Sequence, residues 1–244
     1  MKAQMESPTL SNSPSEQSGD ARGVLRRALQ LLASGAILAA SMFVPAGTLS
    51  WWQAWAFLGI YFGAILVNAL FVLRADSGLI AERGRTAENT KSWDRVITGV
   101  LTLLTIALLA TGGLDKRFGW SHVSLPVSVF GLALIVFGEA IVGWAMSANR
   151  YFSRVVRIQN DRGHQVCSSG PYHHVRHPGY TGMILYSIAM SFGLGSWCAL
   201  GPALLVAITF VVRTVLEDRT LQAELPGYRE YASRVRYRLV PGVW

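Results

Sequence analysis

Long runs of apolar residues alternate with short polar segments along most of the chain. A transmembrane helix needs roughly 20 consecutive apolar residues, so runs of this length predict spans of a bilayer. The last run is too long for one span and is interrupted at Gly193–Trp197 and at Gly201 and Pro202, which favours a tight hairpin of two shorter helices. The runs are Ala28–Val44, Trp52–Leu73, Val96–Leu114, Leu125–Ala148 and Tyr180–Leu216. The pattern predicts an all-α, polytopic membrane helical bundle with five to six transmembrane helices and a C-terminal helical hairpin.

Composition and charge agree with this prediction. Hydrophobic residues make up 51% of the 244 residues and charged residues only 15%, and the mean hydropathy is +0.34. If the spans alternate in direction, all but two of the 22 Lys and Arg residues fall on one side, and the exceptions are Lys116 and Arg117. The positive-inside rule makes the basic side the cytoplasm and places both termini there. The positive net charge therefore reflects topology, and we expect membrane lipid rather than nucleic acid as a partner.

Three regions differ in composition. Residues 1–20 are rich in Ser, Pro and other polar residues, which is typical of a disordered cytoplasmic tail. Residues 21–148 hold the amino-terminal transmembrane helices, and residues 149–244 hold most of the polar motifs together with the final hairpin. Cys167 and Cys198 lie on opposite faces of the membrane in this topology, so we expect no disulfide between them.

The densest polar stretch, "GPYHHVRHPGYTG" (Gly170–Gly182), stands directly before an apolar run. Pro178 suits the first position of a helix, which makes His177 a residue before the helix with extended geometry. The free N–H groups of that helix end, with His and Tyr side chains around them, would suit a carboxylate or phosphate on a ligand. Two other readings stay open. These side chains can be headgroup-level anchors, or His173 and His177 can bind a metal.

A metal is the less favoured of these readings. His173 and His177 are four residues apart, and that spacing brings two side chains together only on a helix. The prolines at Pro171 and Pro178 argue against a helix there. No Asp, Glu or Cys with ligand spacing accompanies the histidines, so we expect no metal site.

A second informative stretch follows the last apolar run. Arg213 and Glu217 are separated by four residues and share one helix face. Arg213 lies near the cytoplasmic boundary, where a cation must be paired or hydrated. An intrahelical ion pair, a snorkelling arginine and a functional residue are all compatible with this position. Glu139, which lies in the middle of a predicted span, either faces a ligand cavity or is protonated and bonded to a neighbouring helix.

The C-terminal segment begins with Pro226 and Gly227, which break the preceding helix. The spacing of the apolar residues after this break predicts an amphipathic helix at the cytoplasmic membrane surface, placed to cover the site as a lid. These residues are Tyr228, Tyr231, Val235 and Leu239.

Taken in order, these motifs resemble those of the isoprenylcysteine carboxyl methyltransferase and phospholipid methyltransferase family, integral membrane enzymes that use S-adenosylmethionine. The resemblance covers residues 149–244 and is specific because several motifs keep their order and spacing. They are "HQVC" (His164–Cys167), "GPY" (Gly170–Tyr172), "RHPGYTG" (Arg176–Gly182), "RTVLED" (Arg213–Asp218) and "LPGYREYASRVRYRLVPG" (Leu225–Gly242).

The resemblance implies roles for particular residues. Arg213 is expected to face the methyl acceptor, as the catalytic residue. Asp218 stands where many members have a second Glu, and Leu225 and Pro226 replace a common aromatic. The residues expected to line the S-adenosylmethionine pocket are His164, Gln165, Val166, Cys167, Tyr172, His177, Pro178, Gly179, Tyr180 and Glu217.

The expected function is S-adenosylmethionine-dependent methyl transfer to a lipophilic or small-molecule acceptor at the cytoplasmic membrane face. An O- or S-acceptor such as a carboxylate is favoured, because an amine must first lose a proton and no base is clearly spare. N-methylation of a lipid amine remains an alternative, as does a non-enzymatic membrane protein. Sterol-type NADPH reductases carry a related R-x-P-N-Y-x-G-D/E segment, but this chain has Gly179 at the Asn position and Met183 at the acidic position.

Overall fold

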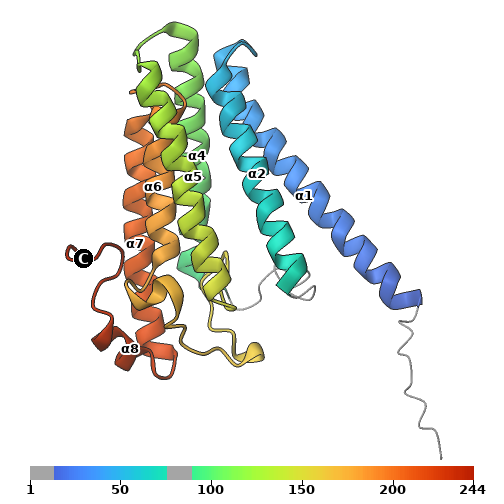
Figure 1. Ribbon diagram of the computed structural model, residues 1–244, viewed down its shortest axis with the longest axis vertical. Coiled ribbons are helices and arrows are strands. Elements are labelled where there is room, and N and C mark those ends of the chain that lie inside the picture. The colour runs from blue at the N-terminus through green and yellow to red at the C-terminus, as the bar shows by residue number, and fades with distance from the viewer. Residues whose placement is uncertain (1–13, 76–89) are drawn as a thin grey trace, which may run out of the picture.

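The computed structural model describes residues 14–75 and 90–244, and all regular secondary structure in this part of the chain is helical. This confirms the predicted all-α class. The helices are α1 (Pro14–Ala46), α2 (Trp52–Ala75), α4 (Ser92–Phe118), α5 (Leu125–Ala148), α6 (Pro178–Gly193), α7 (Leu200–Glu224) and α8 (Tyr228–Arg234), with short 3-10 turns η1 (Asn160–Arg162) and η2 (Gly170–His173). In Figure 1, α1 and α2 lie beside the group formed by α4, α5, α6 and α7, and α8 lies at the lower end of that group.

Four of the described helices are long and apolar enough to cross a membrane: the Leu29–Ala46 part of α1, then α4, α5 and α7. Helix α6 has only 16 residues, or roughly 24 Å at 1.5 Å per residue, which is shorter than a hydrocarbon core of about 30 Å. Leu194–Ala199 connects α6 to α7, as the predicted hairpin requires. Gly201 and Pro202 lie in the first turn of α7, where proline does not break a helix.

The first helix starts earlier than expected. Residues 14–20 are helical, where the sequence predicted a disordered tail, and residues 1–13 lie outside the described residues. Pro14 is the first helical residue, and proline is favoured there because its fixed φ suits a helix and its missing N–H would be unpaired anyway.

Glycines bring α5 and α6 into backbone contact. A Cβ atom on Gly138 would lie 2.9 Å from the carbonyl oxygen of Gly182, and a Cβ on Gly182 would lie 2.6 Å from that of Gly138. Near the other end of the pair, a Cβ on Gly131 would lie 2.4 Å from the backbone nitrogen of Gly193. Small residues let membrane helices approach this closely, so they fix α6 on α5 and set where the start of α6 lies.

The turn between α6 and α7 is tied to the α4–α5 connection by polar contacts. The buried Asp115 carboxylate accepts hydrogen bonds from the hydroxyls of Ser121 and Ser196. The backbone N–H of Trp197 donates to the Ser121 hydroxyl at 2.9 Å. The final hairpin therefore reaches the same end of the molecule as the α4–α5 connection. Cys198 belongs to this turn, and it and Cys167 are both free thiols.

The C-terminal helix differs from the predicted surface helix. Helix α8 ends at Arg234, so Val235 and Leu239 lie outside it. The reason is a long-range backbone pairing, in which the N–H groups of residues 176 and 177 donate to the carbonyls of residues 237 and 238, both at 2.9 Å. Tyr228 and Tyr231 are buried with Leu225, so the apolar face of α8 packs against the protein.

Candidate active site

The start of α6 is held between α7 and the C-terminal segment. Pro178 is the first residue of the helix and His177 is its N-cap, as the sequence predicted. The hydroxyl of Thr181 donates to the carbonyl of Leu239 at 2.8 Å, and the Arg176 side chain donates through Nη1 to the carbonyls of Val235 and Arg236. These bonds join the motif around the start of α6 to the last ten residues of the chain.

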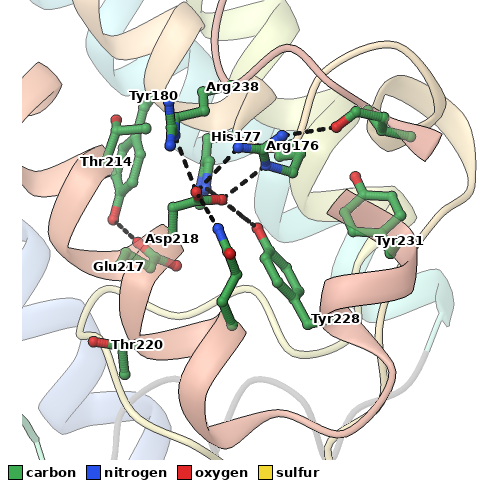
Figure 2. A network of polar contacts seen from close by, with 12 residues as sticks. Arg176, His177, Tyr180, Thr214, Glu217, Asp218, Thr220, Tyr228, Tyr231 and Arg238 are labelled. Atoms are coloured by element: carbon green, nitrogen blue, oxygen red, sulfur yellow. Dashed lines mark hydrogen bonds and ion pairs between the residues drawn. The ribbon is translucent and has the colours of Figure 1, made fainter. Parts of the chain in front are cut away.

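Asp218 lies at the centre of this junction with none of its surface exposed (Figure 2). Its two oxygens accept from five side chains that belong to four segments of the chain. The donors are Arg176 (Nε 2.8 Å, Nη2 3.0 Å), His177 (Nε2 3.3 Å), Gln222 (Nε2 2.8 Å), Tyr228 (OH 3.0 Å) and Arg238 (Nε 3.0 Å). A buried carboxylate needs such partners, and here both guanidinium groups neutralise it. We call Asp218 and these five residues the Asp218 network.

Burial also changes the pKa values of tyrosines in and around this network, and it acts on Arg176. It raises the pKa values of Tyr172, Tyr228 and Tyr231, so their phenols stay protonated. Tyr231 donates to the carbonyl of Tyr172 at 2.7 Å. Burial alone would lower the pKa of Arg176, but its hydrogen bonds and ion pair with Asp218 more than offset this, and its pKa is raised. The guanidinium therefore stays charged at any pH at which the protein works.

On the other side of His177 lies a second group, made of Tyr180, Arg213 and Glu217, which we call the Tyr180 group. The Tyr180 hydroxyl donates to Oε2 of Glu217 (Figure 2). The His177 ring stacks on the Tyr180 ring with centroids 5.8 Å apart and an interplanar angle of 14°. The Cζ atom of Arg213 lies 5.4 Å from the centre of the same ring, a cation–π arrangement.

Arg213 is only 5% exposed and is paired with a residue that the sequence did not single out. Its Nε and Nη2 donate to Oδ1 and Oδ2 of Asp94 at 2.8 and 3.2 Å, and Nη2 also donates to the carbonyl of Arg154 at 2.7 Å. Within the residues that the structure describes, Glu217 pairs with Tyr180 and not with Arg213. Of the three sequence readings of Arg213, these contacts exclude the intrahelical ion pair with Glu217.

The "HQVC" segment approaches the same end of the molecule from the loop after α5. Nδ1 of His164 accepts from the backbone N–H of Gln159 at 3.3 Å, so its ring proton is on Nε2. Burial, and then the nearby Arg157 and Arg162 cations, lower the pKa of His164 and keep it neutral. The ring packs on Tyr151, with centroids 4.6 Å apart.

The other predicted pocket residues take different positions. Gln165 is exposed, and Val166 packs against the apolar cluster of Leu225, Tyr228 and Tyr231. The Cys167 thiol donates to the carbonyl of Ala148 at 3.3 Å. Pro178 and Gly179 are buried, and a Cβ on Gly179 would lie 2.7 Å from the Phe152 ring. The structure thus brings His177, Tyr180, Arg213 and Glu217 into contact, while His164 contacts a different set of residues.

The remaining histidines of the motif belong to neither group. His173 and His174 are exposed and border a shallow depression with Arg234 and Arg236, which shares no lining residue with the Tyr180 group. In the described residues, no group of three or more His, Cys, Asp or Glu side chains could hold a metal ion.

Comparison with known proteins assigns the family. The model of the isoprenylcysteine carboxyl methyltransferase (ICMT) family matches residues 131–223. Protein-S-isoprenylcysteine O-methyltransferase A of Arabidopsis thaliana is 33% identical over 143 residues, which cover 57% of this chain and 68% of that protein. The chain belongs to the ICMT family.

Other ICMT-family relatives match over a shorter part of the chain. Protein-S-isoprenylcysteine O-methyltransferase B of Arabidopsis thaliana is 31% identical over 112 residues, or 45% of this chain and 57% of that protein. The Homo sapiens protein-S-isoprenylcysteine O-methyltransferase is 32% identical over 117 residues, which cover 45% of this chain and 39% of that protein. The chain thus spans little more than half the length of the Arabidopsis relative B and less of the human one. The family match includes every predicted site residue but leaves out Asp94 and α8.

Proposed function

We propose that this ICMT-family protein transfers a methyl group from S-adenosylmethionine to a carboxylate oxygen of a lipophilic acceptor. The observation that carries the proposal is the Tyr180 group, in which motif residues from α6 and α7 meet inside the segment that matches the family. The names of the relatives, protein-S-isoprenylcysteine O-methyltransferases, support an oxygen acceptor on a prenylated cysteine.

The side chains present fit the charged groups of S-adenosylmethionine. Glu217 uses Oε2 for Tyr180, and Oε1, which has no partner within the described residues, suits an ammonium group. The neutral His164 carries a proton on Nε2 that suits a carboxylate. Asp94, Arg213 and Glu217 together carry a net negative formal charge, which favours a bound cation. When bound, the cofactor supplies an electrophilic methyl group on a sulfonium.

Arg213 is the proposed catalytic residue, in the sense that it contacts the acceptor. Its Nη1 has no hydrogen-bond partner among the described residues, and a carboxylate can accept from it. A carboxylate needs no base at neutral pH, so the work of the site is alignment for an in-line displacement. An amine acceptor would need a base, and Nε2 of His177 is already held by Asp218 and Tyr228, at 3.3 and 3.4 Å.

The proposed site lies on the cytoplasmic side, with both termini. Of the basic residues whose side chains the structure describes, most lie at the end of the molecule that carries α8, while Lys116 and Arg117 lie at the opposite end of α4. A lipophilic acceptor would reach the Tyr180 group from the bilayer, with its carboxylate at the membrane surface.

The decisive experiment measures labelled methyl transfer by purified protein in liposomes. N-acetyl-S-farnesylcysteine should be methylated, and the label should be released by base because the product is an ester. The matching farnesylcysteine amide, which lacks the carboxylate, and phosphatidylethanolamine should not be methylated. Base-stable label on the phosphatidylethanolamine amine, with no label on the farnesylcysteine, would overturn the proposal in favour of N-methylation.

A further inference from the structure

Asp94 is a fully buried carboxylate beside the Tyr180 group that the family match leaves out, and the proposed function gives it no contact with cofactor or acceptor. It lies in the first turn of α4, where the helix dipole favours a negative charge. It is separated from Arg213 by 119 positions in the sequence, and none of its surface is exposed.

The contacts of Asp94 fix the plane of the Arg213 guanidinium. The side-on pair uses both carboxylate oxygens, and the backbone N–H of Val156 donates to Oδ2 at 2.8 Å. The second hydrogen of Arg213 Nη2 is used by the carbonyl of Arg154. A bidentate pair of this kind restrains orientation as well as position. After these bonds are made, the N–H groups of Nη1 are the ones left for a ligand.

The same contacts determine the position of the Arg213 guanidinium. Without a partner, a buried guanidinium near the membrane boundary would turn toward water or toward Glu217, four residues along the same helix. Paired with Asp94, it stays over the Tyr180 ring, and Glu217 is left to Tyr180 and to a ligand.

We infer that Asp94 is a positioning residue for Arg213, which holds Nε and Nη2 so that Nη1 faces the carboxylate of the methyl acceptor. The inference rests on the proposed function, because it assigns Arg213 to that acceptor. It extends the functional residues to α4, outside the segment that the family match covers. The acceptor loses its negative charge during methyl transfer, so a fixed cation supports acceptor binding more than the rate of the chemical step.

The competing explanation is that Asp94 only clamps α4 against α7. The chain contains a matched control, because Lys91 and Glu224 form a second ion pair between the start of α4 and the end of α7, at 2.7 Å. That pair is 31% and 44% exposed and does not touch Arg213. Glu224→Gln therefore removes an α4–α7 ion pair and leaves the guanidinium in place.

The test compares Asp94→Asn, Asp94→Glu and Glu224→Gln in full-length protein in liposomes. For Asp94→Asn we expect the KM for N-acetyl-S-farnesylcysteine to rise by about tenfold or more, with kcat and S-adenosylhomocysteine affinity within about threefold of wild type. Asp94→Glu keeps the negative charge, so its KM should lie between those of Asp94→Asn and wild type. Glu224→Gln should leave KM unchanged. A wild-type KM in Asp94→Asn, or an equal loss of cofactor and acceptor affinity, would overturn the inference.

Two further measurements separate this inference from the proposed function. In an Arg213→Lys background, which already lacks the guanidinium fork, Asp94→Asn should raise KM by less than about twofold more, and additive effects would contradict the inference.

Direct binding of farnesylcysteine carboxylate and amide to wild type and Asp94→Asn needs no methyl transfer. Wild type should prefer the carboxylate and the variant should not. A wild type that binds the carboxylate but transfers no methyl group would refute the proposed function alone, whereas one without that preference would refute both.

Discussion

Replacing Asp218 by Asn should destabilise the protein more than any other single change of a described carboxylate at the end of the molecule that carries α8. The substitution keeps the shape of the side chain but removes the charge that neutralises Arg176 and Arg238. Breaking a buried ion pair by removing one partner costs about 3–5 kcal/mol. At roughly 2–4 °C per kcal/mol for a chain of this size, the thermal midpoint should fall by about 6–20 °C.

The size of this effect follows from burial, so the control is an exposed carboxylate. Asp161 is 57% exposed in its pair with Arg157, and Asp161→Asn should change the free energy of unfolding by about 0–1 kcal/mol. Thermal unfolding in detergent, followed by tryptophan fluorescence, compares the two variants. Asp218→Asn also frees the C-terminal segment that Arg176 and Arg238 hold, so trypsin should cleave after Arg234 faster than in wild type. Equal thermal midpoints for the Asp218 and Asp161 variants would refute the assignment of Asp218 as the centre of the network.

Gly131→Ala should destabilise the α5–α6 contact by about 1–3 kcal/mol, because its Cβ would lie 2.4 Å from a backbone nitrogen, while Gly143→Ala in open space on the same helix should not. His164 has a folded-state pKa below its usual 6.5, so the stability that its neutral ring contributes is complete above that pH and is lost as the pH falls through the folded pKa. Thermal midpoints at about pH 7.5 and pH 5.5 should therefore differ less in His164→Gln than in wild type. In sealed, right-side-out vesicles of the Cys167→Ser variant, a membrane-impermeant maleimide should label the exposed Cys198 from outside; labelling only after lysis would contradict the proposed orientation.

The sequence predicts the helices of this fold well where one physical signal dominates. An apolar run of sufficient length must be a helix in a bilayer, because no other single segment satisfies its own backbone there. The hairpin was predictable because Gly193–Trp197 interrupts such a run. The end of α8 was not, because it depends on backbone pairing between residues 176–177 and residues 237–238, which leaves no trace in local periodicity.

The contacts among the candidate site residues were predictable only in part. His177, Tyr180, Arg213 and Glu217 belong to motifs with fixed spacing, and the structure brings them together. Asp94 has no such signal, since an acidic residue in a first helical turn is common and its partner is 119 residues away. That contact requires knowing how α4 packs against α7, which apolar runs do not specify.

Glu217 and Asp218 are consecutive carboxylates with different surroundings, and the geometry of α7 accounts for this. Neighbouring residues on a helix point about 100° apart. The Asp218 carboxylate therefore faces Arg176 and Arg238, while the Glu217 carboxylate faces the Tyr180 hydroxyl. Five side chains occupy both oxygens of Asp218 and leave it nothing to offer a ligand. Glu217 has one oxygen engaged by Tyr180 and one without a partner in the described part of the chain. Stability and ligand binding should therefore respond separately to changes at these adjacent positions, with Asp218 governing the first and Glu217 the second.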